Sequence, residues 1–420
     1  MAGTLEMPIN AVLQLRDSLQ NTSLSILLLG FVILFLAALA FLYLALYILA
    51  PAPRQPYPSE KSYITTSALG KATPPLPLPS WHDTWAEQQR KGLAASGEID
   101  PAEVVMSVVI PAYNEEERLE GMLEEAIAYL DAEYGRPSQP LPGNASGRKA
   151  LNGGGPRHRG ARNGRVSTQP SGYEILLVND GSTDKTVDVA LRIAQKRELH
   201  DVLRVVTLKD NRGKGGAVTH GFRHVRGQYA IFADADGASR FSDLGKLVKG
   251  CEDVNDGPGR GVAVGSRAHM VGSEAVIKRS ALRNALMHGF HLLLRLLTPP
   301  ATSRIKDTQC GFKLFSRASL PHIIPYMHAE GWIFDVEMLM LAESAPPPPD
   351  AAPPSNPRSS REPNAAQPNK VGPGIRVAEV PIGWQEVGGS KLNVMWDSLG
   401  MAWGLALLRL SWALGVYRRR

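Results

Sequence analysis

The chain has 420 residues, 44% of them hydrophobic, and a formal net charge of +6. Its two cysteines, Cys251 and Cys310, are too few for a disulfide framework, and neither lies in a spacing typical of zinc sites. No basic run is interleaved with aromatic residues, so nucleic acid is not an expected partner. The mild basic charge is compatible with binding to phosphates or to an anionic membrane surface, and it selects neither.

The first predicted element is an apolar helix over residues 24–50, after a short tail formed by residues 1–23. This stretch carries no charge. At about 1.5 Å per residue it is long enough to cross a hydrocarbon core of about 30 Å. A cleaved signal peptide would have a shorter apolar stretch, and a helix of a soluble core is rarely apolar on every side. Pro51 ends the helix. We therefore expect a transmembrane anchor.

The charges around this anchor predict its orientation. Arg16, beside Asp17, precedes it. Three basic residues follow it closely: Arg54, Lys61 and Lys71. Because cytosolic flanks carry the excess of lysine and arginine, the large C-terminal part is expected in the cytosol.

The middle of the chain predicts an α/β domain. Residues 51–102 are rich in proline and polar residues and are expected to form a linker. Beyond them, strands alternate with helices. The predicted strands cover residues 104–110, 174–180, 202–210 and 228–236. Their apolar, β-branched runs are typical of parallel strands buried on both faces, so the alternation indicates a doubly wound sheet.

Two segments interrupt this pattern. Residues 134–172 and 344–370 are rich in proline, serine and asparagine and are expected to be flexible insertions. The main domain is therefore assigned to residues 103–343 and 371–395.

Three acidic motifs follow predicted strands. They are PAYNE at 111–115, NDGSTD at 179–184 and DADG at 234–237. Ligands of parallel sheets bind beyond the carboxyl ends of the strands, which is where these motifs are expected to lie.

Asp234 and Asp236 predict a metal site. Strand residues two apart point to the same face, so the two carboxylates should lie together. Such a pair can hold a hard divalent cation, Mg²⁺ or Mn²⁺, whose remaining positions a diphosphate fills. The cation would neutralise charge on a departing diphosphate. The alternative is an acidic pair that caps a helix.

A glycine-rich segment, KDNRGKGG at 209–216, lies between the second and fourth predicted strands. Its glycines allow a phosphate to approach the backbone, and the helix that follows offers free N–H groups. Lys214 adds positive charge. The segment matches neither the P-loop pattern nor the dinucleotide fingerprint, so ATPase and dinucleotide sites are disfavoured. The alternative is an ordinary turn.

In this order and spacing, the four motifs resemble those of the inverting family-2 glycosyltransferases with the GT-A fold. The resemblance implies a nucleotide-sugar-binding, doubly wound mixed sheet in which Asp234 and Asp236 carry the metal. It also implies a nucleotide-sugar site made of motif residues: Pro111, Tyr113, Asn114, Glu115, Asp180, Lys209, Arg212, Gly213, Lys214, Asp234 and Ala235.

Later segments narrow the resemblance to the dolichyl-phosphate β-glucosyltransferase branch. They are GSR at 265–267, DTQCGFK at 307–313 and GWIFDVE at 331–337, together with the N-terminal anchor. The resemblance implies UDP-glucose as donor, dolichyl phosphate as acceptor, and an endoplasmic reticulum membrane with the catalytic domain in the cytosol. The two insertions depart from the family pattern.

The same resemblance makes Asp335 and Asp236 the candidate catalytic residues. A phosphate acceptor is already anionic near pH 7, because its second pKa is about 6. Asp335 is therefore expected mainly to position the acceptor, with general-base catalysis as the alternative. The candidates for contact with the acceptor phosphate or substrate are Arg267, Gln309, Lys313, Trp332 and Glu337.

Two other functions stay open at this point. A mannosyltransferase that uses GDP-mannose would share the chemistry, since glucose and mannose differ at one hydroxyl. A non-catalytic, membrane-tethered nucleotide-binding protein would share the anchor. Processive polysaccharide synthesis is disfavoured because no QxxRW segment occurs. The sequence gives no prediction of oligomeric state.

The last predicted element, 396–420, is apolar but broken by Asp397 and Arg409. We expect it to lie on the membrane, with the terminal arginines at anionic headgroups, and a second span is the alternative. Residues 282–297 have the same apolar and basic character, typical either of an interfacial helix or of a helix packed on the domain.

Overall fold

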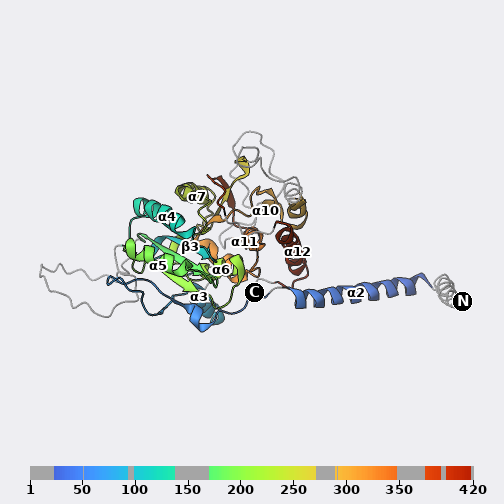
Figure 1. Cartoon of the computed structure of the whole chain (residues 1–420). Helices are drawn as coiled ribbons and strands as arrows, with labels where there is room; N and C mark the ends of the chain where they lie inside the picture. Colours follow the sequence, from blue (N-terminus) through green and yellow to red (C-terminus); the bar gives the residue numbers. More distant parts are fainter. Residues whose placement is uncertain are drawn as a thin grey trace, which may run out of the picture. The chain divides into compact units, whose positions relative to one another are not determined.

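A computed structural model describes most of the chain (Figure 1), namely residues 23–50, 52–92, 99–137, 170–270, 289–290, 292–347, 374–388 and 394–417. The chain divides into two compact units, one made of residues 1–51 and 406–420 and the other of residues 52–405.

The smaller unit contains helix α2 (Leu24–Leu49), which lacks charged side chains. Its most apolar stretch of 18 residues has a mean hydropathy of 2.9 and no buried residue. Within the described part of the chain, α2 is the one helix that is long and apolar enough to cross a membrane. Its length and composition therefore fit the predicted anchor. The end of α12 (Val394–Ala413), from residue 406 onward, belongs to the same unit.

The larger unit is built on a seven-stranded mixed sheet in the order β5-β4-β3-β6-β8-β7-β9. Strands β5, β4, β3 and β6 run parallel, β8 is antiparallel to both β6 and β7, and β9 is parallel to β7. The bounds are β3 (Val104–Ala112), β4 (Tyr173–Asn179), β5 (Leu203–Thr207), β6 (Gly227–Ala233), β7 (Val262–Ser266), β8 (Phe312–Ser316) and β9 (Val377–Pro381). This sheet confirms the predicted α/β class.

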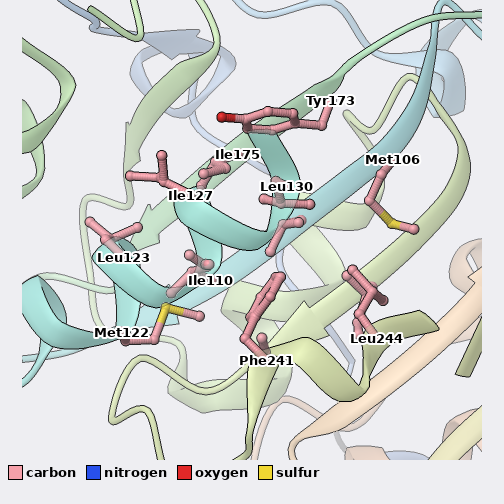
Figure 2. Packing of buried hydrophobic residues seen from close by; sticks show 14 of the residues in the cluster. Met106, Ile110, Met122, Leu123, Ile127, Leu130, Tyr173, Ile175, Phe241 and Leu244 are labelled. Carbon is pink, nitrogen blue, oxygen red and sulfur yellow. The ribbon is translucent and has the colours of Figure 1, made fainter. Parts of the chain in front are cut away.

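Helices cover both faces of the sheet. On one face, α4 (Leu119–Glu133), α5 (Thr186–Lys196) and α7 (Leu244–Asp253) share a core with alternate strand residues. Figure 2 shows Leu123 and Ile127 of α4 packed beside Ile110 and Ile175 of the strands. Truncating Ile127 to alanine would cost about 2–5 kcal/mol, the usual range for a fully buried isoleucine.

The other face is covered by α6 (Gly213–Phe222) and α11 (Phe334–Glu343). Phe222 packs edge-on against Phe232 of β6, with ring centroids 6.2 Å apart, and Phe334 packs against the same ring in a tilted arrangement at 5.6 Å. Gly221 lets α6 approach β3, because a Cβ there would lie 2.5 Å from Cγ1 of Val109. The remaining short helices are α10 (Pro300–Arg304), η1 (Pro58–Lys61), η2 (Phe241–Asp243), η3 (Ala268–Met270), η4 (Arg317–His322) and η5 (Ile324–Tyr326).

The prediction of a linker over residues 51–102 is wrong for residues 54–90, which we call the strap. The strap contains η1, β1 (Ser62–Tyr63), β2 (Leu76–Pro77) and α3 (Trp81–Arg90). Ile64 exchanges backbone hydrogen bonds of 2.9 Å with Val205 of β5, and the indole of Trp81 donates to the carbonyl of Phe222 at 2.7 Å. The prolines do not make this segment a free linker, since Pro58 begins a 3₁₀-helix within it.

Several predicted segments lie largely outside the described residues. They are the insertions at 134–172 and 344–370, the first part of the helix expected at 282–297, and the C-terminal arginines.

Candidate active site

The carboxyl ends of β4, β3 and β6 lie side by side at one edge of the sheet. Ala112 of β3 is in register with Asn179 of β4, and the Asp180 N–H donates to the Ala112 carbonyl at 2.8 Å. The PAYNE and NDGSTD loops therefore leave the sheet next to each other, as the sequence predicts.

Hydrogen bonds join these two loops. Oδ1 of Asn114 accepts from the Thr183 N–H at 2.7 Å, and the Asn114 N–H donates to Oγ of Ser182 at 2.9 Å. Asn114 has a φ of 54°, a left-handed conformation that asparagine tolerates better than most residues. Tyr113 precedes it and is 40% exposed, and Pro111 lies within β3.

Glu115 also takes part in this junction. Its N–H donates to Oγ1 of Thr186 at 2.8 Å, and its carboxylate lies 2.6 Å from the guanidinium of Arg118. Its side chain is thus engaged within the wall of the site.

Asp180 is buried at the start of the NDGSTD loop. Its Oδ1 accepts from the Arg212 N–H at 2.7 Å, and its carbonyl accepts from Nδ2 of Asn211 at 3.0 Å. Burial raises the pKa of Asp180 to about 7, because the hydrogen bonds from the backbone of Arg212 and Gly213 only partly offset the cost of burying its charge. This loop therefore carries a carboxyl group that changes ionisation near neutral pH.

Asp234 and Asp236 follow β6 directly. Oδ1 of Asp234 lies 2.6 Å from Nζ of Lys214, and Oδ1 of Asp236 accepts from the Ala238 N–H at 3.0 Å. Burial and the nearby charge of Asp234 raise the pKa of Asp236. Two mutually repelling carboxylates at a strand end form a site that favours a cation.

These residues fit a hard divalent cation. Carboxylate oxygens are the ligands that Mg²⁺ and Mn²⁺ prefer. Among the residues described, no group of three or more His, Cys, Asp or Glu side chains could hold a metal. A cation on Asp234 and Asp236 would take its further ligands from water or from a substrate.

Gly311 leaves room for the Asp234 carboxylate because it has no side chain. The Asp234 N–H donates to the Gly311 carbonyl at 3.1 Å. A Cβ on Gly311 would lie 2.0 Å from Oδ2 of Asp234, far inside contact distance. The Asp234 carboxylate thus occupies the space that a side chain at position 311 would take.

Lys214 is at the first turn of α6, beside this acidic group. Burial opposes its charge, but Asp234, Asp335 and Asp236 outweigh that effect and raise its pKa. Nζ also lies 5.9 Å from the ring centroid of Trp332, which is 38% exposed. Lys214 therefore lies where the DxD motif and the GWIFDVE segment meet.

The glycines of α6 have a packing role that the sequence did not predict. A Cβ on Gly213 or Gly215 would lie 2.8 Å from the carbonyl of Glu330, and the Gly216 N–H donates to the same carbonyl at 3.1 Å. These glycines were predicted to let a phosphate approach the backbone. In the structure they also let the backbone of residues 329–331 pack closely against α6.

Asp335 is paired with Lys313 in the interior. Lys313 is fully buried, its Nζ donates to the Cys310 carbonyl at 2.7 Å, and it forms a very short ion pair with Asp335. Burial raises the pKa of Asp335, while Lys313 and Lys214 oppose that rise. Lys313 is predicted to contact a phosphate, and in the structure its ammonium group contacts Asp335.

Other cations predicted to meet phosphates are also paired with carboxylates. Arg267 forms a two-pronged pair with Asp307 at 2.7 and 2.8 Å, and Arg212 binds Glu330. Lys209 lies 4.6 Å above the ring of Tyr57 in the strap. Each of these side chains is oriented by the protein itself.

The remaining predicted residues have structural contacts. Glu337 is fully buried and accepts from the N–H groups of His328 and Ala329 at 2.9 and 2.7 Å, so it fixes the loop before Trp332. Nε2 of Gln309 lies 2.7 Å from the sulfur of Met401 in α12. Ala235 is buried between the two aspartates.

Sequence reasoning missed Glu330, Asp307, Gly311 and Glu60 as parts of the site. Gly311 lies inside a motif that the sequence singled out, so its lack of a side chain was the available signal. Asp307 begins the same motif, but its pairing with Arg267 depends on a long-range contact, and Glu330 and Glu60 lie outside every motif that the sequence singled out.

Comparisons with known proteins show which proteins this chain is similar to. Residues 164–323 match the family model described as glycosyl transferase family 2. The chain is 38% identical to the dolichyl-phosphate beta-glucosyltransferase of Saccharomyces cerevisiae, over 92% of this chain and 94% of the yeast protein. It is 36% identical to the human protein of that name, over 74% of this chain and 77% of the human one. A crystal structure of glucosyl-3-phosphoglycerate synthase from Mycobacterium tuberculosis with Mn²⁺, UDP and phosphoglyceric acid is 17% identical, with a TM-score of 0.40, and covers 74% of this chain and 79% of that chain.

Proposed function

Since this chain belongs to the dolichyl-phosphate β-glucosyltransferase family, we propose that it transfers glucose from UDP-glucose to dolichyl phosphate with inversion at the anomeric carbon. The observation that carries the proposal is the convergence of Asp234, Asp236 and Lys214 with Asp335 at the carboxyl edge of a GT-A sheet.

The donor lies along the PAYNE and NDGSTD loops in this proposal. Asn114 and Asp180 present polar groups there, and the exposed ring of Tyr113 offers a surface for the base. Lys214 places its positive charge beside the position of the diphosphate. Because the two loops are hydrogen-bonded to each other, this wall is formed before the donor arrives.

Asp234 and Asp236 would hold a divalent cation together with the donor diphosphate. When bound, such a cation supplies a positive charge that stabilises the UDP leaving group. Lys214 adds a second positive charge at the same place, since its ammonium group already lies against Asp234.

Asp335 orients the acceptor in this proposal. The acceptor phosphate is anionic at neutral pH, so its oxygen attacks the anomeric carbon without first losing a proton to a strong base. The buried Lys313 holds the Asp335 carboxylate in one place, and the exposed ring of Trp332 lies 5.9 Å from Nζ of Lys214. A bond forms between the phosphate oxygen and the anomeric carbon of glucose, and the bond from that carbon to UDP breaks.

The reaction is assigned to the cytosolic face of the endoplasmic reticulum membrane. Helix α2 anchors the chain, and the basic residues that follow it favour the cytosolic side for the catalytic domain. On α12, the exposed side chains Trp396, Leu399 and Trp403 suit a helix that lies in the membrane interface.

Membranes that contain the full chain test this function. They are incubated with dolichyl phosphate, Mg²⁺ and either labelled UDP-glucose or labelled GDP-mannose, and the labelled lipid is extracted. We expect a glucose lipid from the first donor, and no mannose lipid above the level of membranes without the chain. Mannose lipid alone would overturn the donor assignment. Failure with both donors, while UDP-glucose still binds, would favour a non-catalytic nucleotide-binding protein.

A further inference from the structure

The strap meets the donor site at one buried carboxylate, Glu60. Although Glu60 has no exposed surface, both of its oxygens are saturated. Arg54 donates to them at 2.5 and 2.8 Å, the Tyr57 N–H donates at 2.9 Å, and the Lys209 N–H donates at 2.9 Å. Burial opposes ionisation, but these donors outweigh it and lower the pKa of Glu60 to about 2.

Lys209 is the first residue of the KDNRGKGG segment, so this hydrogen bond fixes the backbone where the segment begins. The guanidinium of Arg54 and the ammonium of Lys209 lie 4.3 and 4.6 Å from the ring centroid of Tyr57. Arg54 also lies 4.0 Å from Asp210. The carbonyl of Glu60 accepts from the imidazole of His220 in α6 at 2.9 Å, with Nε2 as the nitrogen involved. Strap contacts therefore fix both ends of the span from Lys209 to His220.

That span carries two of the groups assigned to donor binding. The Arg212 N–H holds Oδ1 of Asp180 at 2.7 Å, and Lys214 holds Asp234 at 2.6 Å. A shift of the backbone at Lys209 would move both contacts together. In the chain, Arg54 follows the end of α2 at Leu49 by a few residues.

We propose that Glu60, held by Arg54, is a positioning residue that sets the backbone of residues 209–214 for UDP-glucose. The inference rests on the proposed function, because it names the donor as the substrate whose binding depends on this contact. Glu60 contacts no reacting group, so its effect passes through the Lys209 backbone to Arg212 and Lys214.

The test measures the KM for UDP-glucose, the KM for dolichyl phosphate and kcat in the full chain with Glu60→Gln. Glutamine has the same shape, but its amide N–H₂ group is a donor and cannot accept hydrogen bonds. It would therefore break the hydrogen bonds to one of the two positions that the Glu60 oxygens occupy. We expect the KM for UDP-glucose to rise about tenfold, with the KM for dolichyl phosphate and kcat within about threefold of the wild type. Arg54→Ala should raise the donor KM by a smaller factor, since two backbone donors remain, and Arg54→Lys should restore most of it.

Thr65→Val is the matched control within the strap. Thr65 is buried and donates to the Leu203 carbonyl at 2.7 Å, away from the Lys209 loop. It should lower the melting temperature while leaving the donor KM unchanged. If Glu60→Gln and Arg54→Ala behave like Thr65→Val, or raise both KM values equally, the positioning role is wrong. If the wild type itself does not use UDP-glucose in this assay, the proposed function fails instead.

Discussion

Carboxylates lie at both ends of the parallel strands, and their pKa values are shifted in opposite directions at the two ends. At the amino end of β4, Glu174 is fully buried and accepts hydrogen bonds from Ser107 at 2.6 Å and from Arg226 at 2.6 to 2.8 Å. Burial opposes its ionisation, but Arg226 and Arg204 outweigh that cost and lower its pKa. At the carboxyl end, burial raises the pKa of Asp180 and Asp236 instead.

The contrast distinguishes a structural carboxylate from a functional one within one sheet. Glu174 has all its partners in the protein, so it stabilises the fold and offers nothing to a ligand. The negative charges of Asp234 and Asp236 repel each other, and Lys214 offsets only part of that charge. A divalent cation bound with a diphosphate would offset the rest. Burial alone does not distinguish a structural carboxylate from a functional one. The number and the charge of the protein groups that contact the carboxylate distinguish them.

The largest effect is expected at the structural end. Glu174→Ala removes the shared partner of Arg226 and Arg204 and leaves two buried guanidinium groups less compensated. The free energy of unfolding should fall by about 3–5 kcal/mol, as is usual when one member of a buried ion pair is lost. Urea unfolding in detergent measures this change. The stabilisation is present above the ordinary pKa of 4.5 and is lost as the pH falls below it, because the folded-state pKa is lowered.

Activity per folded molecule provides the control for this variant. It should stay within about threefold of the wild type, because Glu174 lies at the opposite end of β4 from Asp180. A large loss of kcat with normal stability would show that the two ends are not distinct in function.

The next effect is expected at the functional end. Asp236→Asn keeps the size of the side chain but removes one of two adjacent carboxylates. We expect kcat for glucosyl transfer to fall by about 1,000-fold, the upper part of the range for loss of one charge-stabilising group. The melting temperature should not fall, because repulsion from Asp234 is relieved. Transfer assays on extracted lipid, with thermal unfolding of the same preparations, measure both quantities. A variant that keeps full activity would move the metal site elsewhere.

Gly311→Ala should have a smaller effect at the same place. Its Cβ would lie 2.0 Å from Oδ2 of Asp234, so the carboxylate has to rotate away from its position. We expect a loss of about 100-fold in kcat, since the ligand remains but is misplaced. Adding more Mg²⁺ should recover part of the activity, which it should not do for Asp236→Asn. Gly331→Ala is the matched control, because a Cβ there has no neighbour within 4 Å.

The comparison also shows what the sequence could predict. The strands and acidic motifs were accessible because apolar runs followed by Asp234 or Asp180 are local patterns. The partners of the cations were not, because they depend on long-range contacts. Lys313 meets Asp335 across 22 positions, Arg267 meets Asp307 across 40, and Arg212 meets Glu330 across 118.

The strap shows the same limit in its strongest form. Glu60 binds the backbone of Lys209 across 149 positions, and the surrounding sequence is rich in proline. Composition indicates a linker there because it reports the conformational freedom of the free segment. It does not report the hydrogen bonds that a segment makes once it docks on β5 and α6.

The smallest effect concerns pH, and it separates Asp180 from the saturated Glu174 most directly. Burial raises the pKa of Asp180 to about 7, so in the free enzyme this group takes up a proton as the pH falls through 7. Uridine offers N–H and O–H donors, which the carboxylate accepts better than the neutral acid does. The ratio kcat/KM for UDP-glucose should therefore fall below about pH 7, by up to about tenfold per pH unit. Asp180→Asn should have a lower and flat profile.

Stability gives an independent reading of the same proton. The folded-state pKa of Asp180 lies above its ordinary value of 3.8, so the ionised group costs stability. That cost grows as the pH rises from 3.8 toward 7 and is fully present above 7. Asp180→Asn should therefore unfold at a higher temperature than the wild type at pH 8, and the difference should disappear near pH 4. An acid limb that persists unchanged in Asp180→Asn would assign the titration to another group. A stability difference that is the same at pH 8 and pH 4 would show that Asp180 is held as securely as Glu174.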